Sequence, residues 1–297
     1  MPISITLGTA QFGFNYGITN NVGKVNEKSV KKILKKAEKN NIKYLDTAQS
    51  YGNAEEVIGR CKPKDSKFEI NSKLSFLKNE NITENDIQKL EKNFEQTLKN
   101  LKTQSINTFL VHDSKNLKGN KSKKLIKWLQ SLKERELIKN IGISIYDLEE
   151  LNNSYLEDID LIQIPISIYN QKLVDGGYLE SLSNKGYLIH ARSCFLQGLI
   201  LTAAKNWPSH ISRELRDHHF KTELLAKKND LSLIDLSLNY IKNLSFLDSI
   251  IVGTTSALEF QNFLNSWNKK KLTTNKIDFK DLSWDNERDM DPRFWVK

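Results

Sequence analysis

The sequence is poor in cysteine, with only Cys61 and Cys194 among 297 residues. So low a number argues against a disulfide framework, and the two thiols lack the close spacing of a metal site. No apolar run approaches the roughly 18 residues that a transmembrane helix needs. The opening MPISITLGTAQFG has neither the basic region nor the apolar core of a signal peptide. We therefore expect a cytoplasmic protein that does not enter a membrane.

The chain also lacks any Pro-, Gly- or Ser-rich linker, so we expect a single domain over residues 1–297. The formal net charge is +9, but the lysines lie in amphipathic stretches such as VKKILKKAEKNN, without interleaved aromatic residues. That pattern does not favour nucleic-acid binding, although a positive field suits an anionic cofactor or substrate. The DHH run at 217–219 is interpreted as surface, and no metal site is predicted.

Short β-rich runs alternate with helical stretches along the chain. The expected strands lie in ISITLGTA, KYLDTA, FEINSKL, INTFLVHD, IKNIGIS, IDLIQIPIS, GYLIHARS and LDSIIVGTT. The expected helices cover residues 26–41, 54–60, 83–101, 121–137, 147–153, 178–185, 211–243 and 257–267. The strands alternate little between apolar and polar residues, as in parallel sheets with both faces buried.

Eight βα units in a chain of this length predict an α/β fold, a TIM (β/α)8 barrel. The alternative is a doubly wound sheet, which usually carries a GxGxxG turn after its first strand. The glycines of LGTAQFGFNYG have a different spacing, which favours the barrel. The polar tail, from about Lys271 to residue 297, is expected to pack on the exterior or the rim of that barrel.

Four ionisable or proton-bearing residues lie at the ends of three consecutive expected strands. Asp46 ends the second strand, Tyr51 follows in its loop, Lys73 ends the third and His112 the fourth. Singly, these residues have ordinary structural roles, such as a helix N-cap or a turn tyrosine. Barrel enzymes carry their catalytic groups at this end of the strands, so together they predict one catalytic site.

The four residue types form a general acid aimed at a carbonyl that is becoming an alkoxide. The phenol of Tyr51 has an ordinary pKa near 10, and an ammonium beside it is expected to lower that pKa. A carboxylate behind the lysine would keep it charged and oriented, and the imidazole would hydrogen-bond the same substrate oxygen. No nucleophile elbow and no HExxH motif is present.

On these residues the sequence resembles the aldo-keto reductases, over nearly its whole length. LDTAQSYG, SKL and VHD match the catalytic Asp, Tyr, Lys and His of that family. GIS and DLIQIPISIYN resemble the motifs that bind the nicotinamide carboxamide, ARSCFLQG the segment along the nicotinamide and pyrophosphate, and VGTTSALEFQN the adenosine site. The resemblance implies cofactor contacts from Gly8, Thr9, Ser144, Gln163, Arg192, Ser193, Phe195, Gln197, Gly198, Gly253, Thr254, Thr255, Gln261 and Asn262.

Several positions depart from the family pattern. Ile145 follows the strand-5 serine where Asn is common, and Arg192 takes the place of a stacking aromatic residue. The last loop holds Val252, Ser256 and Leu258 where the family usually offers a cation to the 2′-phosphate of NADPH. We expect NADPH use with weaker discrimination against NADH than is usual in the family, with hydroxyl groups or a lysine from elsewhere holding the phosphate.

The resemblance implies an NAD(P)H-dependent enzyme that transfers hydride to or from an aldehyde or ketone, with Tyr51 as general acid. The sequence LGTAQFGFNYGI favours a sugar-derived small-molecule carbonyl, and loop aromatics are candidates to line the pocket: Phe12, Phe14, Tyr16 and Trp207. The family default is a monomer. The alternative function is a reductase-like module that senses the cofactor and regulates a partner protein.

Overall fold

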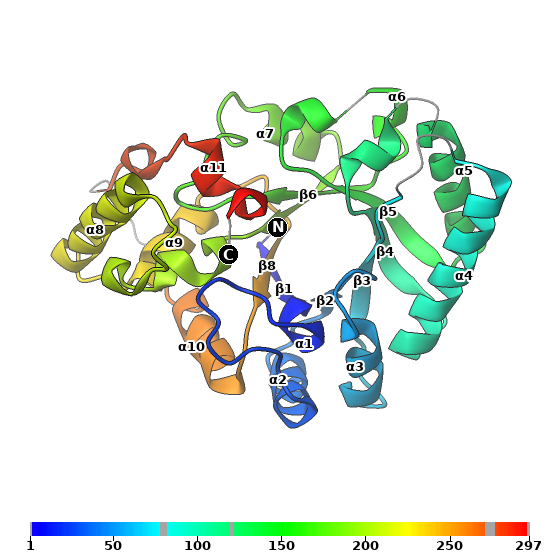
Figure 1. Cartoon of the computed structure of the whole chain (residues 1–297), viewed down its shortest axis with the longest axis horizontal. Helices are drawn as coiled ribbons and strands as arrows, with labels where there is room; N and C mark the ends of the chain where they lie inside the picture. The colour runs from blue at the N-terminus through cyan, green and yellow to red at the C-terminus, as the bar shows by residue number, and fades with distance from the viewer. Residues whose placement is uncertain (1, 78–81, 119–120, 152, 271–276, 296–297) are drawn as a thin grey trace.

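The strands form a closed parallel barrel in which each strand pairs with its neighbours in the chain and β1 pairs with β8 (Figure 1). This computed structural model describes residues 2–77, 82–118, 121–151, 153–270 and 277–295. The predicted single-domain (β/α)8 barrel is confirmed. The strands are β1 Ser4–Gly8, β2 Tyr44–Asp46, β3 Glu69–Leu74, β4 Ile106–Val111, β5 Ile138–Ser144, β6 Leu161–Pro165, β7 Leu188–Arg192 and β8 Ser249–Gly253.

Helices connect the strands and surround the barrel (Figure 1). Side-chain caps explain where several of them begin: Asn26 accepts from Ser29 N before α2, and Thr83 forms a capping box with Asp86 before α4. The helices are α1 Ala10–Gly13, α2 Glu27–Lys39, α3 Ala54–Cys61, α4 Glu84–Leu101, α5 Lys121–Glu134, α6 Asn153–Leu156, α7 Tyr178–Asn184, α8 Arg213–Lys228, α9 Leu233–Lys242, α10 Ala257–Trp267 and α11 Glu287–Met290.

Two expected helices differ from the structure. The stretch predicted as one helix over 211–243 is two helices, because Asp230 adopts a left-handed φ of 54° and Ser232 caps α9. The stretch predicted over 147–153 is the 3-10 turn η2, Leu148–Glu150, followed by α6, and its residue 152 lies outside the described residues. The short α1, directly after β1, was not predicted.

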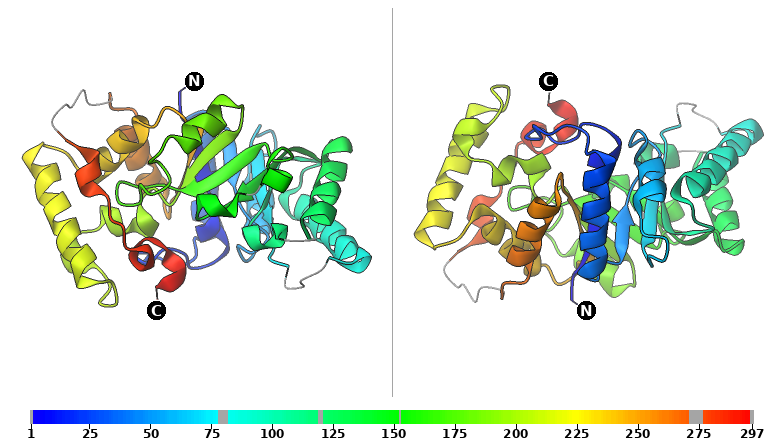
Figure 2. Two further views of the ribbon diagram at one scale, coloured as in Figure 1. Left: turned by 90° about the horizontal axis from the view of Figure 1, so that it is seen from above. Right: turned by 90° about the horizontal axis from the view of Figure 1, so that it is seen from below.

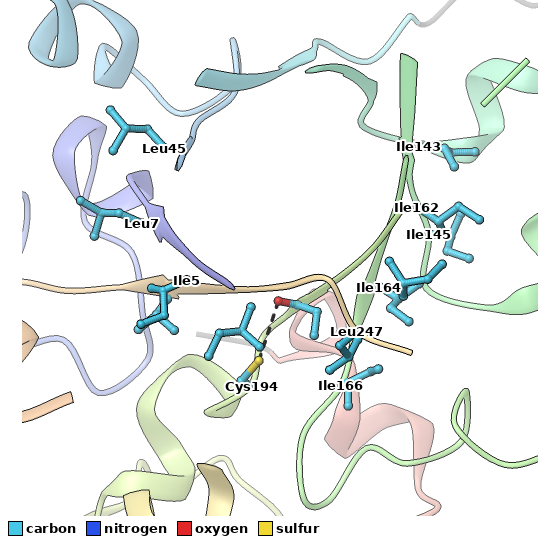
Figure 3. Packing of buried hydrophobic residues seen from close by; sticks show 14 of the residues in the cluster. Ile5, Leu7, Leu45, Ile143, Ile145, Ile162, Ile164, Ile166, Cys194 and Leu247 are labelled. Atoms are coloured by element: carbon cyan, nitrogen blue, oxygen red, sulfur yellow. Dashed lines mark hydrogen bonds between the residues drawn. The ribbon is translucent and has the colours of Figure 1, made fainter. Parts of the chain in front are cut away.

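The strands divide their side chains between two environments. Gln163 on β6 reaches Asp46 on β2 across the barrel, so these side chains point into its interior. Their neighbours Leu45 and Ile162 alternate to the outer face, where the strands pack against the helices. Figure 3 shows part of this buried apolar cluster, Leu45, Ile143 and Ile162 among its labelled residues.

The C-terminal segment 277–295 packs against the loop that follows β6 and against α8, where His218 Nε2 contacts Leu282 O at 3.0 Å. Trp284 N donates to Tyr169 O at 2.8 Å, and Gln171 Nε2 donates to Phe279 O at 2.6 Å. The last described turn, η6 (Pro292–Phe294), lies at the opposite end of the barrel from the start of β1 (Figure 2). Of the tail predicted from Lys271, residues 271–276 and 296–297 lie outside the described residues.

Both cysteines, Cys61 and Cys194, are free thiols in buried positions. Among the described residues, no helix is both long and apolar enough to cross a membrane. The same part of the chain contains no group of three or more His, Cys, Asp or Glu side chains arranged to hold a metal ion.

Candidate active site

A buried ion pair joins the ends of β2 and β3. Lys73 Nζ donates to Asp46 Oδ1 and, at 2.8 Å, to the backbone oxygen of Thr47. The two side chains are only 1% and 4% exposed. Burial lowers the pKa of Lys73, and the adjacent Asp46 carboxylate opposes that shift. The lysine is therefore fixed in position by two acceptors at the mouth of the barrel.

The second carboxylate oxygen of Asp46 has a partner that the sequence did not suggest. Gln163 Nε2 donates to Asp46 Oδ2 at 2.9 Å. Gln163 also lines the cavity at the barrel mouth, where it was predicted to contact the nicotinamide carboxamide. A residue predicted to contact the cofactor thus also orients the carboxylate that holds Lys73.

Tyr51 and His112 lie beside this pair. The Lys73 Nζ is 5.1 Å from the centroid of the Tyr51 ring. The rings of Tyr51 and His112 pack edge to face, with their centroids 5.7 Å apart. His112 Nδ1 pairs with Ser50 Oγ at 3.2 Å. The loop after β2 and the fourth strand therefore bring together the four residues that the sequence predicted as one site.

The protonation of Tyr51 and His112 follows from their burial. Burial raises the pKa of Tyr51 above its ordinary 10.0, and the Asp46 carboxylate raises it further. This differs from the predicted lowering by Lys73, since the lysine charge is balanced by a carboxylate in direct contact. Burial and the charges of Lys73 and Arg192 lower the pKa of His112 to about 3. At neutral pH the phenol keeps its proton and the imidazole is uncharged.

A cavity of about 520 Å³ opens at this end of the barrel. Asp46, Tyr51 and His112 line it, while Lys73 lies buried behind them. Thr254, Gln261 and Asn262, also predicted to contact the cofactor, are not among the lining residues. The other predicted cofactor residues line this cavity: Gly8, Thr9, Ser144, Gln163, Arg192, Ser193, Phe195, Gln197, Gly198, Gly253 and Thr255.

Arg192, at the end of β7, binds neighbouring loops of the barrel mouth. Its Nε donates to Ser144 Oγ at 3.3 Å and its Nη2 to Ile145 O at 3.1 Å. Its guanidinium carbon lies 4.1 Å from the ring centroid of Tyr146, and that of Arg293 lies 3.5 Å from the same centroid. Sequence reasoning missed Tyr146, which lines the cavity, and Arg293, which brings the C-terminal segment to its edge.

The loop after β7 has an unusual backbone. Ser193, Leu196 and Gln197 adopt left-handed φ angles of 58°, 47° and 55°, which are uncommon for residues other than glycine. Such conformations concentrate at functional sites, where the surrounding structure maintains them. Thr19 Oγ1, from the loop after β1, donates to Gln197 O at 3.2 Å. The β1 loop therefore reaches across the cavity mouth to the β7 loop.

The start of α10 forms the far part of the cavity wall. Ser256 is the N-cap and accepts from Glu259 N at 3.1 Å. Glu259 Oε2 in turn accepts from Thr255 N and Thr255 Oγ1, both at 2.7 Å, and from Thr254 Oγ1 at 3.1 Å. Glu259 lines the cavity and was not predicted. The signal for it was the Ser-x-x-Glu pattern of a capping box at 256–259.

The four aromatic residues named as pocket candidates occupy different environments. Tyr16 lines the cavity, and burial raises its pKa to about 12. Phe14 packs against the rings of Tyr16 and Tyr51 but is not itself a lining residue. Phe12 is fully buried in the core, and Trp207 is buried with its Nε1 donating to Leu199 O and Thr202 O. Those two are packing residues.

The prediction that the DHH run at 217–219 lies on the surface is wrong for His219. Its side chain is fully buried, Nδ1 pairs with Tyr169 Oη at 2.5 Å, and Nε2 contacts Thr202 O at 2.9 Å. Its ring also stacks on Trp207. The apolar side of α8 accommodates the imidazole because Tyr169 and Thr202 satisfy both nitrogens.

The aldo/keto reductase family model matches residues 4–281 of this chain. The chain belongs to the aldo/keto reductase family. It is accordingly an NAD(P)H-dependent oxidoreductase. No curated protein matches the sequence significantly.

Solved structures of aldo-keto reductases share the fold at low sequence identity. The holo form of an aldo-keto reductase from Bacillus halodurans is 18% identical, with a TM-score of 0.73 over 94% of this chain and 90% of that one. A glycerol dehydrogenase from Gluconobacter oxydans is 17% identical, with a TM-score of 0.66 over 91% of this chain and 87% of that one.

The cavity of this aldo-keto reductase fits a nicotinamide dinucleotide in size and in chemistry. Its volume lies within the roughly 300–1,000 Å³ of typical cofactor sites. The wall offers hydroxyl and amide groups from Ser144, Gln163, Ser193 and Gln197. Gly253 also lines it, and a Cβ there would come within 2.6 Å of the Gln11 side chain. The catalytic groups and the start of α10 belong to one continuous cavity.

Proposed function

We propose that this protein reduces an aldehyde or ketone to an alcohol, reversibly, with Tyr51 as the proton donor. The proposal rests chiefly on one arrangement, in which the Tyr51 phenol lies near both the Lys73–Asp46 pair and the ring of His112 at the wall of the cavity. The reacting oxygen of a carbonyl substrate would meet Tyr51 and His112 there. Both groups are uncharged at neutral pH, so both can donate a hydrogen bond to that oxygen.

In this mechanism the bound nicotinamide supplies the hydride, and the chain supplies the proton and the electrostatics. Tyr51 gives its proton to the carbonyl oxygen as that oxygen becomes an alkoxide, which is more basic than a phenolate. Neutral His112 orients the same oxygen by hydrogen bonding. Lys73, held by Asp46 and Thr47 O, stabilises the phenolate that Tyr51 becomes. In alcohol oxidation the same groups act in reverse.

Residues on opposite sides of the cavity would hold the cofactor. Ser144 and Gln163 are the predicted partners of the nicotinamide carboxamide, and Gln163 would couple cofactor binding to Asp46 through its amide nitrogen. The predicted preference for NADPH depends on hydroxyl and amide donors at the start of α10. Thr254 and Thr255 already contact Glu259 through their hydroxyls, and these contacts compete with any contact to a phosphate.

The substrate we favour is a hydroxylated carbonyl compound such as a sugar derivative. Polar side chains surround the proposed proton donor, with the phenols of Tyr16 and Tyr146 and the guanidinium of Arg192 on the same cavity wall. Such groups pair with hydroxyls and would leave an apolar aldehyde with unsatisfied neighbours. The likeness in fold to a glycerol dehydrogenase, named for a polyol, agrees with this choice.

A panel of carbonyl substrates, assayed with NADH and with NADPH by loss of cofactor absorbance, tests the proposal. We expect turnover of hydroxylated aldehydes or ketones at a higher kcat/KM than of apolar ones of similar size. Tight cofactor binding without turnover of any member would contradict the enzyme and leave the cofactor-sensing module as the better account. Preferential turnover of apolar aldehydes would contradict the substrate class alone.

A further inference from the structure

Glu259 places a negative charge on the cavity wall at the start of α10. One of its oxygens, Oε2, accepts from Thr255 N and Thr255 Oγ1. The single hydroxyl proton of Thr254 is shared between this oxygen, at 3.1 Å, and Ser256 O, at 3.0 Å. These donors are the groups that an anion would need there, and the amide ends of an α-helix add a partial positive charge at the same place. The carboxylate of the chain itself occupies this cluster of donors.

Within the described part of the chain, no cation on the cavity wall balances Glu259 locally. Among the described residues that line the cavity, Arg192 carries the one permanent positive charge, and it contacts Ser144 and Ile145 beside the catalytic groups. Lys36 on α2 does reach α10, where its Nζ donates to Gln261 Oε1 at 2.6 Å. Lys36 is not a lining residue of the cavity. An incoming anion at the start of α10 would therefore meet the carboxylate first.

We propose that Glu259 makes this enzyme prefer NADH to NADPH. The inference rests on the proposed function, in which a nicotinamide dinucleotide extends from Tyr51 to the start of α10. A ribose hydroxyl can donate a hydrogen bond to a carboxylate that is already held in place. A 2′-phosphate would bring about two negative charges against it and would have to displace it from Thr254 and Thr255.

A preference for NADH is the opposite of the preference for NADPH expected from the sequence. That expectation treated Thr254, Thr255 and Ser256 as donors available to a phosphate. The Thr255 hydroxyl instead donates to Glu259, and the Thr254 hydroxyl donates to Glu259 or to Ser256 O. Ser256 Oγ accepts from the backbone of Glu259 as the N-cap. Because these contacts also resemble a capping box, Glu259 has a structural role, and the test must separate selectivity from stability.

Isothermal titration calorimetry of the whole protein with NADH and with NADPH, without substrate, gives the selectivity directly. The wild type is expected to bind NADH more tightly. Glu259→Gln keeps an oxygen acceptor and removes the charge, so the ratio of Kd for NADPH to Kd for NADH should fall by about ten- to a hundredfold, the range of a hydrogen bond to a charged group. Glu95→Gln, an exposed change of equal charge on α4, is the control and should leave the ratio unchanged.

Two results would overturn the inference while leaving the proposed function intact. One is tighter wild-type binding of NADPH that Lys36→Met weakens selectively, which would make Lys36 the partner of the 2′-phosphate. The other is a Glu259→Gln protein that melts at a lower temperature but keeps the wild-type ratio, which would leave only the capping role. Failure of the wild type to bind either dinucleotide would instead remove the proposed function itself.

Discussion

Asp46 is held at both carboxylate oxygens, by Lys73 from β3 and by Gln163 from β6. The pair is almost completely buried, so each charge is stabilised mainly by the other rather than by water. At the scale of single residues, the site is therefore a coupled unit. Tyr51 acts beside this unit, and its proton stays in place because burial and Asp46 both raise its pKa.

Lys73→Met should abolish carbonyl reduction and also destabilise the fold. Removing one partner of a buried ion pair typically lowers the free energy of unfolding by about 3–5 kcal/mol, because Asp46 is left as an unpaired charge. Adding Asp46→Asn should recover most of that loss, since the stranded carboxylate disappears, while activity stays lost. Urea titrations and turnover assays of both single variants and the double variant measure the two effects.

Equal loss of stability in the double variant and in Lys73→Met would show that the ion pair is not what couples the two residues. Recovery of activity in the double variant would show that the charge of Lys73 is dispensable for proton transfer.

The sequence predicted the residues whose position depends on a strand end, and missed contacts between residues that lie far apart along the chain. Asp46 and His112 directly follow apolar residues, and Lys73 lies near the end of the expected strand FEINSKL, so the strand ends place all three at the barrel mouth. Gln163 and Asp46 are 117 positions apart, and only the closed barrel brings them into contact. The burial of His219 depends likewise on Tyr169, 50 positions away.

The strands and helices were largely predictable because each has a local signal. β5 has the predicted bounds, Ile138–Ser144. The break between α8 and α9 also had a local signal, the Asn-Asp pair at 229–230 followed by Ser232 three residues before Asp235. The left-handed backbone of the loop after β7 had no such signal, because Leu196 and Gln197 rarely adopt it. In the structure, this conformation occurs together with a contact from the β1 loop, in which Thr19 Oγ1 donates to Gln197 O.

The contact between α1 and the loop after β2 positions Tyr51. Gly13 lies so close to that loop that an added Cβ would come within 1.7 Å of Tyr51 O. Gly13→Ala should therefore displace the Tyr51 backbone, lower the melting temperature and reduce kcat by at least tenfold, because a misplaced catalytic group loses much of its effect.

Gly59→Ala is the matched control for that variant. Its Cβ would meet Asn100 O at 1.9 Å, between α3 and α4, away from the cavity. It should lower the melting temperature to a similar extent and keep a normal kcat per folded molecule. Equal kcat values in the two alanine variants would show that the Gly13 contact does not position Tyr51.

For the whole molecule, the buried histidines link stability to pH. Burial lowers the pKa of His190 and of His219 to about 4, and that of His112 to about 3, from an ordinary 6.5. Above pH 6.5 these histidines are neutral whether the chain is folded or not. Below it the unfolded chain binds protons that the folded chain cannot accept, so stability falls as the pH decreases from 6.5 towards 4.

The expected loss at pH 5.5 is about 1.4 kcal/mol for each of these histidines relative to pH 7.5. Urea titrations at pH 7.5, 6.5 and 5.5 measure it, and His190→Gln should reduce the pH dependence by one histidine's share. A free energy of unfolding that stays constant over this range would show that the imidazoles accept protons in the folded state.

The closed barrel as a whole brings Tyr51, the Lys73–Asp46 pair and the cavity wall into one place, and the central claim is that Tyr51 protonates the substrate. Tyr51→Phe removes the proton and keeps the ring, so cofactor binding should be unchanged. The most direct test is single-turnover oxidation of the bound reduced cofactor by a carbonyl substrate, in wild type and in this variant. We predict a rate about 10²- to 10⁴-fold lower in the variant, which is the range for a general acid, with an equal Kd for the cofactor. A near wild-type rate in Tyr51→Phe would contradict the account.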